Sequence, residues 1–228
     1  MRATPSPTDS SPPLPRFDYL LRGGTVFDGS GADGVPADVG ILGGTVVAVG
    51  DLSRADAGET VDVRGKFVAP GFIDIHTHSD FTLLSSPGME SSVAQGVTTE
   101  LVGNCGIALG LAQAGEQFTL EQRGLLRAGI TLDWTHLDGF LTRVEDMGIG
   151  ANIATLAGHG TIRKRVLGLA DRLPDAGELA RMERELETAL GAGAVGLSSG
   201  LEYVPGMYAD VAELTAMARV AKRAGGFY

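Results

Sequence analysis

After Pro70, short apolar runs alternate with stretches long enough to form helices. The runs are FIDI, TTELV, NIATLA and AVGLS, at residues 72–75, 98–102, 152–157 and 194–198. Each is bounded by Gly, Pro or polar residues, as is typical of short buried strands. Strands separated by crossover helices favour a parallel sheet, which is either part of a (β/α)₈ barrel or an open doubly wound sheet. The alternation does not separate these two folds.

Two of the intervening stretches have the pattern of amphipathic helices. Residues 176–193 carry apolar side chains at near-helical spacing before a Gly-rich exit. Residues 210–226 form a second candidate, in which we expect Asp210 to cap the start and Gly225 the end. We therefore expect about four β/α units in residues 71–228.

Residues 17–70 have a different pattern, with short apolar runs separated by Gly and Asp. This pattern predicts small antiparallel strands joined by tight turns, with too little material to close a core alone. Residues 1–16 are rich in Pro and Ser and lack the apolar centre of a secretory signal, so we expect a disordered tail.

Charge and composition exclude several classes of protein. The formal net charge of −10 argues against a nucleic-acid-binding surface, which usually carries a basic patch. No segment approaches the roughly 18 to 20 uninterrupted apolar residues of a membrane span. Cys105 is the single cysteine, so the chain forms no internal disulfide and nothing requires an oxidising compartment. The cytoplasm is the default expectation.

Two histidines close the first apolar run, in the stretch GFIDIHTHSD at residues 71–80. Side chains two apart share one face of a strand, so His76 and His78 should converge at its carboxyl end, together with Asp74. Active sites lie at that end in parallel α/β folds, and neutral imidazole is a common zinc ligand. We interpret the pair as metal ligands, with satisfied or surface histidines as the alternative. Asp74 either orients an imidazole or has a structural role.

Cys105 follows the next predicted strand, in VTTELVGNCGIALG at residues 97–110. Gly103 and Gly106 flank it and permit a close approach of the backbone. A thiolate is a strong zinc ligand, so we interpret Cys105 as a third ligand. A buried small hydrophobe and a catalytic nucleophile are the other readings.

Four motifs in the same order resemble the D-aminoacylase or N-acyl-D-amino-acid deacylase branch of the amidohydrolase superfamily. They are GFIDIHTHSD, VTTELVGNCG, AGHGTIR at residues 157–163 and GLSSGLEYVPGMYA at residues 196–209. The resemblance implies an α/β fold, the amino-terminal half of a metal-dependent (β/α)₈ barrel preceded by part of a small β-sandwich-like domain. Residues 17–70 would belong to that small domain, and residues 71–228 to the first four or so units of a truncated barrel.

The resemblance also implies a zinc-dependent hydrolase that removes the acyl group from N-acyl-D-amino acids, by attack of a metal-bound water on a linear amide. His76 and His78 would bind the metal, and Cys105 would replace the carboxylated lysine bridge of related hydantoinases. The family's two further histidine ligands and its general-base aspartate come from later strands. We expect that base beyond the chain end, which leaves the catalytic residue unassigned and predicts an inactive isolated chain.

Other side chains take their expected roles from the same resemblance. Tyr203 would contact the substrate amide and help to stabilise the oxyanion of the tetrahedral intermediate. His159 would contact the substrate or shape the site, with a structural role as the alternative. We expect His136 to be a surface or capping residue and Glu202 to be solvated, and Asp80 is the least constrained.

Two other functions stay open. One is a cyclic-amide hydrolase of the hydantoinase or dihydroorotase kind, and the other is a catalytically inactive truncated fragment whose unpaired strand edges favour association. The expected partner is a small N-acyl amino acid, and neither the number of metals nor the oligomeric state is predicted.

Overall fold

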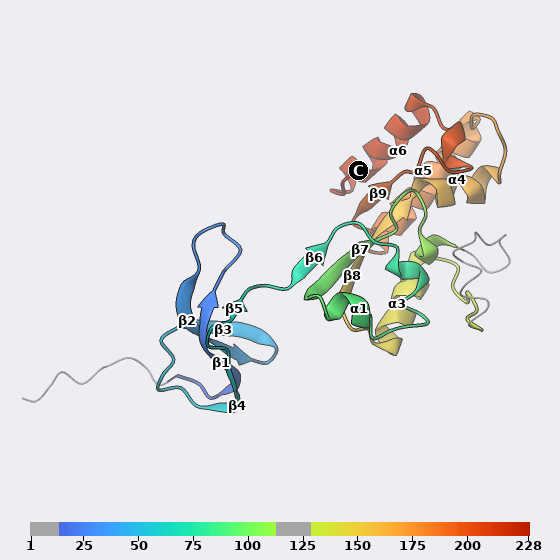
Figure 1. Ribbon diagram of the computed structural model, residues 1–228. Coiled ribbons are helices and arrows are strands. Elements are labelled where there is room, and N and C mark those ends of the chain that lie inside the picture. The colour runs from blue at the N-terminus through green and yellow to red at the C-terminus, as the bar shows by residue number, and fades with distance from the viewer. Residues whose placement is uncertain (1–13, 113–128) are drawn as a thin grey trace, which may run out of the picture. The chain divides into compact units, whose positions relative to one another are not determined.

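The computed structural model describes residues 14–112 and 129–228, so nearly all of the tail expected at residues 1–16 lies outside the described residues. The chain divides into two compact units, which we name the N-terminal unit (residues 1–70) and the C-terminal unit (residues 71–228). Figure 1 labels the elements of both.

The N-terminal unit is a mixed β-sheet in which β1 has neighbours on both sides. Its strands are β1 (Phe17–Val26), β2 (Val35–Leu42), β3 (Thr45–Gly50), β4 (Ala57–Asp62) and β5 (Phe67–Val68). The predicted antiparallel pairing is confirmed for β1 with β2 and for β2 with β3. It is wrong for β4 and β5, which both run parallel to β1. Residues 51–56 carry the chain across to the other edge of β1, so β4 starts beside the start of β1.

The core of the N-terminal unit is small. Phe17, Leu20 and Leu52 are buried and form its central cluster. Val46 and Val49 of β3, in contrast, are more than half exposed. A sheet of this size buries little apolar surface, as the sequence predicts.

The C-terminal unit is built on a four-stranded parallel sheet. Its strands are β6 (Phe72–Asp74), β7 (Val97–Val102), β8 (Asn152–Gly158) and β9 (Gly196–Ser198). They coincide with the four predicted runs and stand in the sheet in chain order. A doubly wound sheet reverses its strand order at a switch point, whereas a barrel does not, so the order favours a barrel. Phe227 adds a parallel bridge to Gly196 beyond β9.

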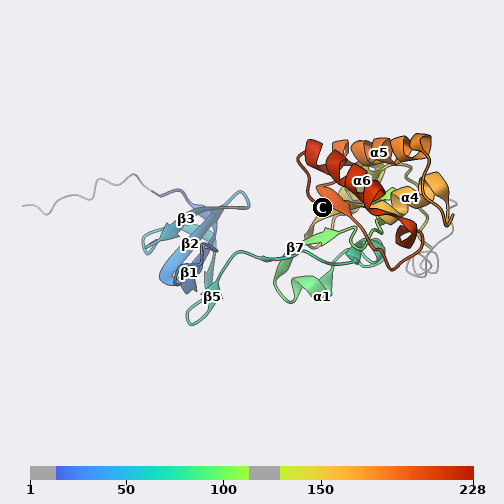
Figure 2. The same cartoon turned by 90° about the horizontal axis from the view of Figure 1, so that it is seen from above.

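Helices follow the strands of the C-terminal unit. They are α1 (Glu90–Val93), α3 (Leu137–Met147), α4 (His159–Leu167), α5 (Ala176–Gly191) and α6 (Val211–Arg223). Both predicted helices are confirmed. Asp175 caps α5 in a capping box with Glu178, and Asp210 caps α6 by accepting from the backbone N–H of Glu213. Figure 2 shows α5 beside α6 along one side of this unit.

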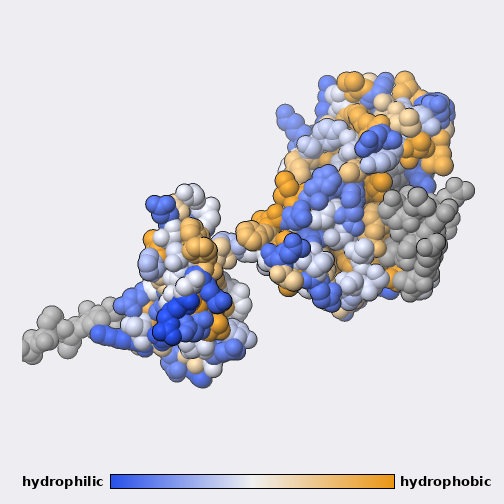
Figure 3. Space-filling view, in the orientation of Figure 1, coloured by the Kyte–Doolittle hydropathy of each residue, from blue (hydrophilic) through white to orange (hydrophobic). Residues whose placement is uncertain are grey.

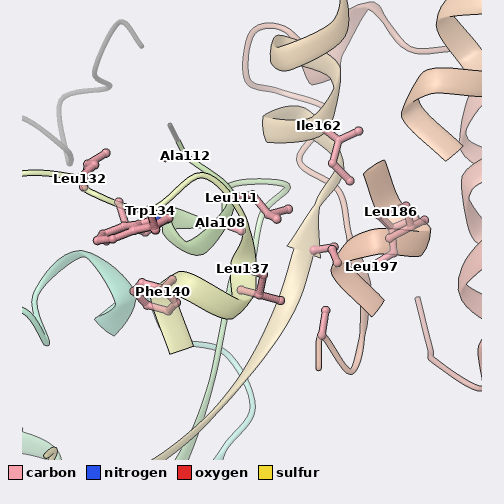
Figure 4. Close-up of a cluster of buried hydrophobic side chains, with 14 of the residues drawn as sticks. Ala108, Leu111, Ala112, Leu132, Trp134, Leu137, Phe140, Ile162, Leu186 and Leu197 are labelled. Carbon is pink, nitrogen blue, oxygen red and sulfur yellow. The ribbon is translucent and has the colours of Figure 1, made fainter. Parts of the chain in front are cut away.

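The core of the C-terminal unit lies between the sheet and the helices. Figure 4 shows Trp134 and Phe140 packed together, with ring centroids 5.2 Å apart, and Leu137 directed toward β8. Leu186 of α5 and Leu197 of β9 continue the same cluster. Each fully buried side chain of this size contributes about 1.5–3 kcal/mol relative to exposure. The packing therefore anchors the strand ends from which the loops of the site start.

The edge of the sheet at β6 is apolar and open. Phe72, Ile73 and Ile75 are 64%, 67% and 71% exposed, and hydrophobic surface gathers around β6 in Figure 3. Such an edge offers unpaired backbone groups to another strand. Among the helices that the structure describes, none is long and apolar enough to cross a bilayer.

Candidate metal centre

Three potential metal ligands meet at the carboxyl ends of β6 and β7. One ligand atom from each of His76, His78 and Cys105 lies within 4.8 Å of the other two. The sulfur of Cys105 is 3.4 Å from Nε2 of His76. A sulfur at about 2.3 Å and a nitrogen at about 2.0 Å from one tetrahedral zinc ion lie about 3.5 Å apart. The spacing and the nitrogen and sulfur chemistry of this donor set fit zinc.

The two histidines reach this position differently from the prediction. Strand β6 ends at Asp74, so the imidazoles lie on the segment that follows the strand. The carboxylate of Asp74 accepts a hydrogen bond from the backbone N–H of His76 at 3.0 Å and so shapes the chain at the strand end. This bond goes to the backbone, which favours the structural role over the orientation of an imidazole, the two alternatives that the sequence left open. His76 and His78 are exposed and Cys105 is partly buried, so all three are accessible to a ligand.

Cys105 sits in an unusual turn. Its φ of +55° is left-handed, between Gly103 at +76° and Gly106 at +72°. A non-glycine residue in this region costs about 1–2 kcal/mol. A Cβ at Gly103 would overlap the carbonyl oxygen of Leu156, and one at Gly106 would lie 2.7 Å from the backbone nitrogen of Gly200. The two glycines were predicted to permit a close approach of the backbone. The structure shows that the groups they approach are the backbone atoms of neighbouring segments.

Hydrogen bonds from β9 and α4 hold this turn in place. The hydroxyl of Ser198 accepts from the N–H of Gly106 at 3.0 Å and donates to the carbonyl of Gly103. Thr161 donates its backbone N–H to the carbonyl of Gly106 at 3.0 Å, and its hydroxyl accepts from Ala108 at 3.1 Å. The thiol is thus presented by a turn that is fixed on two sides.

Tyr203 lies beside Cys105, in the loop between β9 and α6. The two residues and Lys164 line a cavity of about 50 Å³. Tyr203 is 44% exposed, so its ring is accessible. Glu202 is exposed, as expected. Sequence analysis did not single out Lys164, because its place on this cavity depends on how α4 packs against the loop.

His159 is fully buried at the start of α4. Its Nε2 lies 2.7 Å from the carboxylate of Glu213, which also accepts from Nε of Arg163 at 3.0 Å. This partnership favours the structural alternative, while a substrate contact of His159 stays a prediction. His136 is exposed at the N-cap of α3, with no side-chain capping bond. This position agrees with the surface or capping role that we expected for His136.

Asp80 has a role that sequence reasoning missed. It is 1% exposed, and its Oδ2 accepts from the backbone N–H of Leu109 at 2.9 Å. Burial raises the pKa of this carboxyl to about 7. No feature of the HTHSD motif distinguishes a buried aspartate from a solvated one, because the covering chain near Leu109 is distant in sequence.

Known proteins resemble this chain over most of its length. A model of the amidohydrolase family matches residues 59–227. D-aminoacylase of Alcaligenes xylosoxydans xylosoxydans is 40% identical over 224 residues, which is 98% of this chain and 45% of that enzyme. N-acyl-D-glutamate deacylase of Bordetella bronchiseptica, solved with zinc and a phosphonate mimic of the tetrahedral intermediate, is 36% identical with a TM-score of 0.81.

A solved D-aminoacylase with a binuclear metal centre superposes with a TM-score of 0.84 at 37% identity. That match covers 92% of this chain and 44% of the other, as the Bordetella match also does. The chain thus spans less than half the length of the relatives it matches. The predicted fold is confirmed: the chain has the architecture of the amino-terminal half of a (β/α)₈ barrel preceded by part of a small β-domain.

Proposed function

Because this chain belongs to the amidohydrolase family, we propose that it supplies the first metal ligands of a zinc-dependent hydrolase acting on N-acyl-D-amino acids. The observation that carries the proposal is the meeting of two imidazoles and one thiol within 4.8 Å. Donors of this kind are metal ligands in the neutral and deprotonated forms respectively.

A bound zinc ion would lower the pKa of water and polarise the amide carbonyl. His76 and His78 supply nitrogen donors, and Cys105 supplies a sulfur donor from a turn that needs no rearrangement. Exposure of the two imidazoles leaves the site open to a substrate. Among the described residues three donors meet here, whereas a closed structural zinc site takes four protein ligands.

Tyr203 is the candidate for contact with the reacting amide. Its place on the cavity beside Cys105 supports this role. A phenol near the metal donates a hydrogen bond to the oxygen on which negative charge develops. Lys164 lines the same cavity and brings positive charge to a chain whose net charge is −10. The positive charge of Lys164 suits an anionic acyl amino acid better than a neutral ring.

The linear amide and the D configuration rest on the relatives. D-aminoacylase and N-acyl-D-glutamate deacylase, both of Alcaligenes xylosoxydans xylosoxydans, are each 40% identical to this chain. We propose a D-configured substrate on this ground. We expect the 228-residue chain by itself to bind metal without rapid turnover, since the family's general base has no counterpart among its motifs.

Zinc content tests the metal assignment. The purified chain should take up zinc, and Cys105→Ala should reduce its zinc affinity and content. Asp62 is an exposed carboxylate of the N-terminal unit, so Asp62→Ala serves as the control and should leave zinc unchanged. Equal zinc in wild type and Cys105→Ala would contradict the assignment of the thiol.

Ligand binding tests the substrate class. Zinc-loaded protein should bind a phosphonate analogue of an N-acetyl-D-amino acid more tightly than its L enantiomer, with heat of binding that disappears when zinc is removed. Tyr203→Phe should weaken that binding. Turnover of N-acetyl-D-amino acids by the isolated chain would support the function and refute the expected inactivity. Turnover of hydantoins alone would favour the cyclic-amide reading.

A further inference from the structure

Asn104 links the segment that carries the two histidines to the turn that carries the thiol. Its side chain is 6% exposed. The amide nitrogen Nδ2 donates to the carbonyl of Thr77 at 3.1 Å and to the carbonyl of Leu101 at 2.8 Å. Thr77 stands between His76 and His78, and Asn104 immediately precedes Cys105. One carboxamide therefore reaches from the neighbour of the sulfur ligand to the backbone between the imidazoles.

We propose that Asn104 is a positioning residue that sets the spacing between the imidazoles and the thiol, and thereby the affinity for zinc. This inference rests on the proposed metal role of those three side chains. The proposed role acts through the backbone, because the carboxamide nitrogen is hydrogen-bonded to the carbonyls of Thr77 and Leu101.

The sulfur of Cys105 contacts Nε2 of His76 at 3.4 Å, and other hydrogen bonds hold the segment between the imidazoles. Among the described residues, the backbone N–H of Thr77 donates to the carbonyl of Leu101 at 3.2 Å. The hydroxyl of Thr77 donates to the carboxylate of Glu100, also at 3.2 Å. These bonds fix Thr77 against β7. Among the described hydrogen bonds of Thr77, the one from Asn104 is the one that reaches the turn of the thiol.

The physical reason for an effect on affinity is preorganisation. The imidazole segment is exposed beyond a three-residue strand, so without the Asn104 bond its backbone has more freedom. Metal binding would then have to order it, and that cost appears as weaker affinity. Loss of a group that orients metal ligands typically lowers metal affinity about 10- to 100-fold. We expect an effect in that range.

The test compares two variants at Asn104 with a matched control. Asn104→Leu removes both donors at similar volume and without charge, and Asn104→Ala removes them with the side chain. Asn152, which is exposed, donates its Nδ2 to the carbonyl of Thr98 at 3.0 Å, a side-chain to backbone bond of the same kind that joins β8 to β7. Asn152→Ala is therefore the control.

Zinc affinity is measured by competition with a chelating dye. Cobalt is used as a second probe, because a Co²⁺–thiolate bond gives a charge-transfer absorption band. Both Asn104 variants should bind zinc about 10- to 100-fold more weakly and show a weakened or shifted cobalt–thiolate band. Asn152→Ala should keep the wild-type affinity and spectrum, and thermal unfolding of the metal-free proteins should report folded chains throughout.

The outcomes separate this inference from the proposed function. If wild type shows no cobalt–thiolate band and binds zinc no better than Cys105→Ala, the metal assignment fails. If wild type binds zinc through the thiol but the Asn104 variants match it in affinity and spectrum, the positioning role is overturned. Failure of both metal-free Asn104 variants to fold would also overturn it, in favour of a purely structural role.

Discussion

Two polar clusters of the C-terminal unit both contain histidines placed after a strand, and they differ in burial. His76 and His78 are exposed at the candidate metal centre. His159 has no exposed surface and is bonded to Glu213, which is 2% exposed. The difference shows that the residue type and its place after a strand do not decide the role. A donor available for a ligand must be accessible and must lack a permanent hydrogen-bond partner.

The buried cluster supports a loop. Arg163 donates to Glu213 and also to the carbonyls of Ala170 and Pro205, at 3.4 Å and 3.2 Å. The Pro205 bond reaches the loop that carries Tyr203. A buried guanidinium is costly to desolvate, and these bonds, with one from Nη2 to the carbonyl of Arg172, engage all three of its nitrogens. The buried cluster therefore holds the loop that carries Tyr203, while the donors of the exposed cluster are accessible to a ligand.

The largest expected effect comes from breaking the buried cluster. Glu213→Gln removes the charge that partners Arg163 and leaves the guanidinium buried without compensation. We expect the free energy of unfolding to fall by about 3–5 kcal/mol, measured by urea denaturation of the metal-free chain. Glu187 pairs with Arg223 at 3.4 Å, and both side chains are more than half exposed. Glu187→Gln is the control and should cost less than about 1 kcal/mol. Similar losses in both variants would contradict the contrast between buried and exposed charge.

Asp80 allows a second comparison between a buried and an exposed group. It is buried, although it lies two residues from His78, which is exposed. Its pKa is raised from 3.8 to about 7. Between about pH 4 and pH 7 the unfolded chain loses this proton while the folded chain keeps it, so the free energy of unfolding falls as the pH rises. Three pKa units correspond to about 4 kcal/mol, which is an upper limit for the effect.

Asp80→Asn removes this titration and keeps an oxygen for the N–H of Leu109. With a chelator present, the variant should gain stability over wild type as the pH rises from 4 to 7.5. Urea denaturation at each pH measures this difference. Asp138→Asn, at an exposed carboxylate, is the control and should follow wild type. A difference between Asp80→Asn and wild type that stays constant with pH would show that the carboxyl is ionised in the folded chain.

Local signals in the sequence were sufficient for most elements. The four apolar runs match the four parallel strands, and Asp210 caps its helix as expected. Residues close in sequence form these features. The parallel pairing of β4 with β1 was missed, because it depends on where the chain crosses the sheet after β3.

The same limit applies to the candidate site. The motifs identified His76, His78 and Cys105 as candidate metal ligands, because each has a side chain that can bind metal and follows a predicted strand. Glu213 was missed because its partner Arg163 lies 50 residues earlier, so the pair exists only in the folded chain. Asn104 stands inside a quoted motif, yet its partner Thr77 lies 27 residues away. Sequence patterns identify ligands more readily than the groups that hold them.

A substitution in the turn of Cys105 should change stability and zinc affinity in opposite directions. Cys105→Gly removes the thiol and also relieves the left-handed φ of +55°. The relief of about 1–2 kcal/mol is partly offset by the greater entropy of glycine in the unfolded chain. We expect the metal-free variant to be more stable by about 1 kcal/mol or less and to lose most of its zinc affinity. Urea denaturation and dye competition measure the two quantities. Loss of stability would mean that the sulfur packs as a core group.

His136 represents a third situation, a histidine that is exposed and also outside both clusters. It occupies the N-cap of α3 in extended geometry, and its side chain makes no capping bond. Serine accepts a hydrogen bond from a backbone N–H of the first turn, so His136→Ser should stabilise the chain by about 0.5–1 kcal/mol. Thermal unfolding should show the gain, and zinc affinity should equal that of wild type. A fall in zinc affinity would mean that an exposed histidine outside the cluster of His76, His78 and Cys105 also binds metal, which would contradict the assignment of the metal to that cluster.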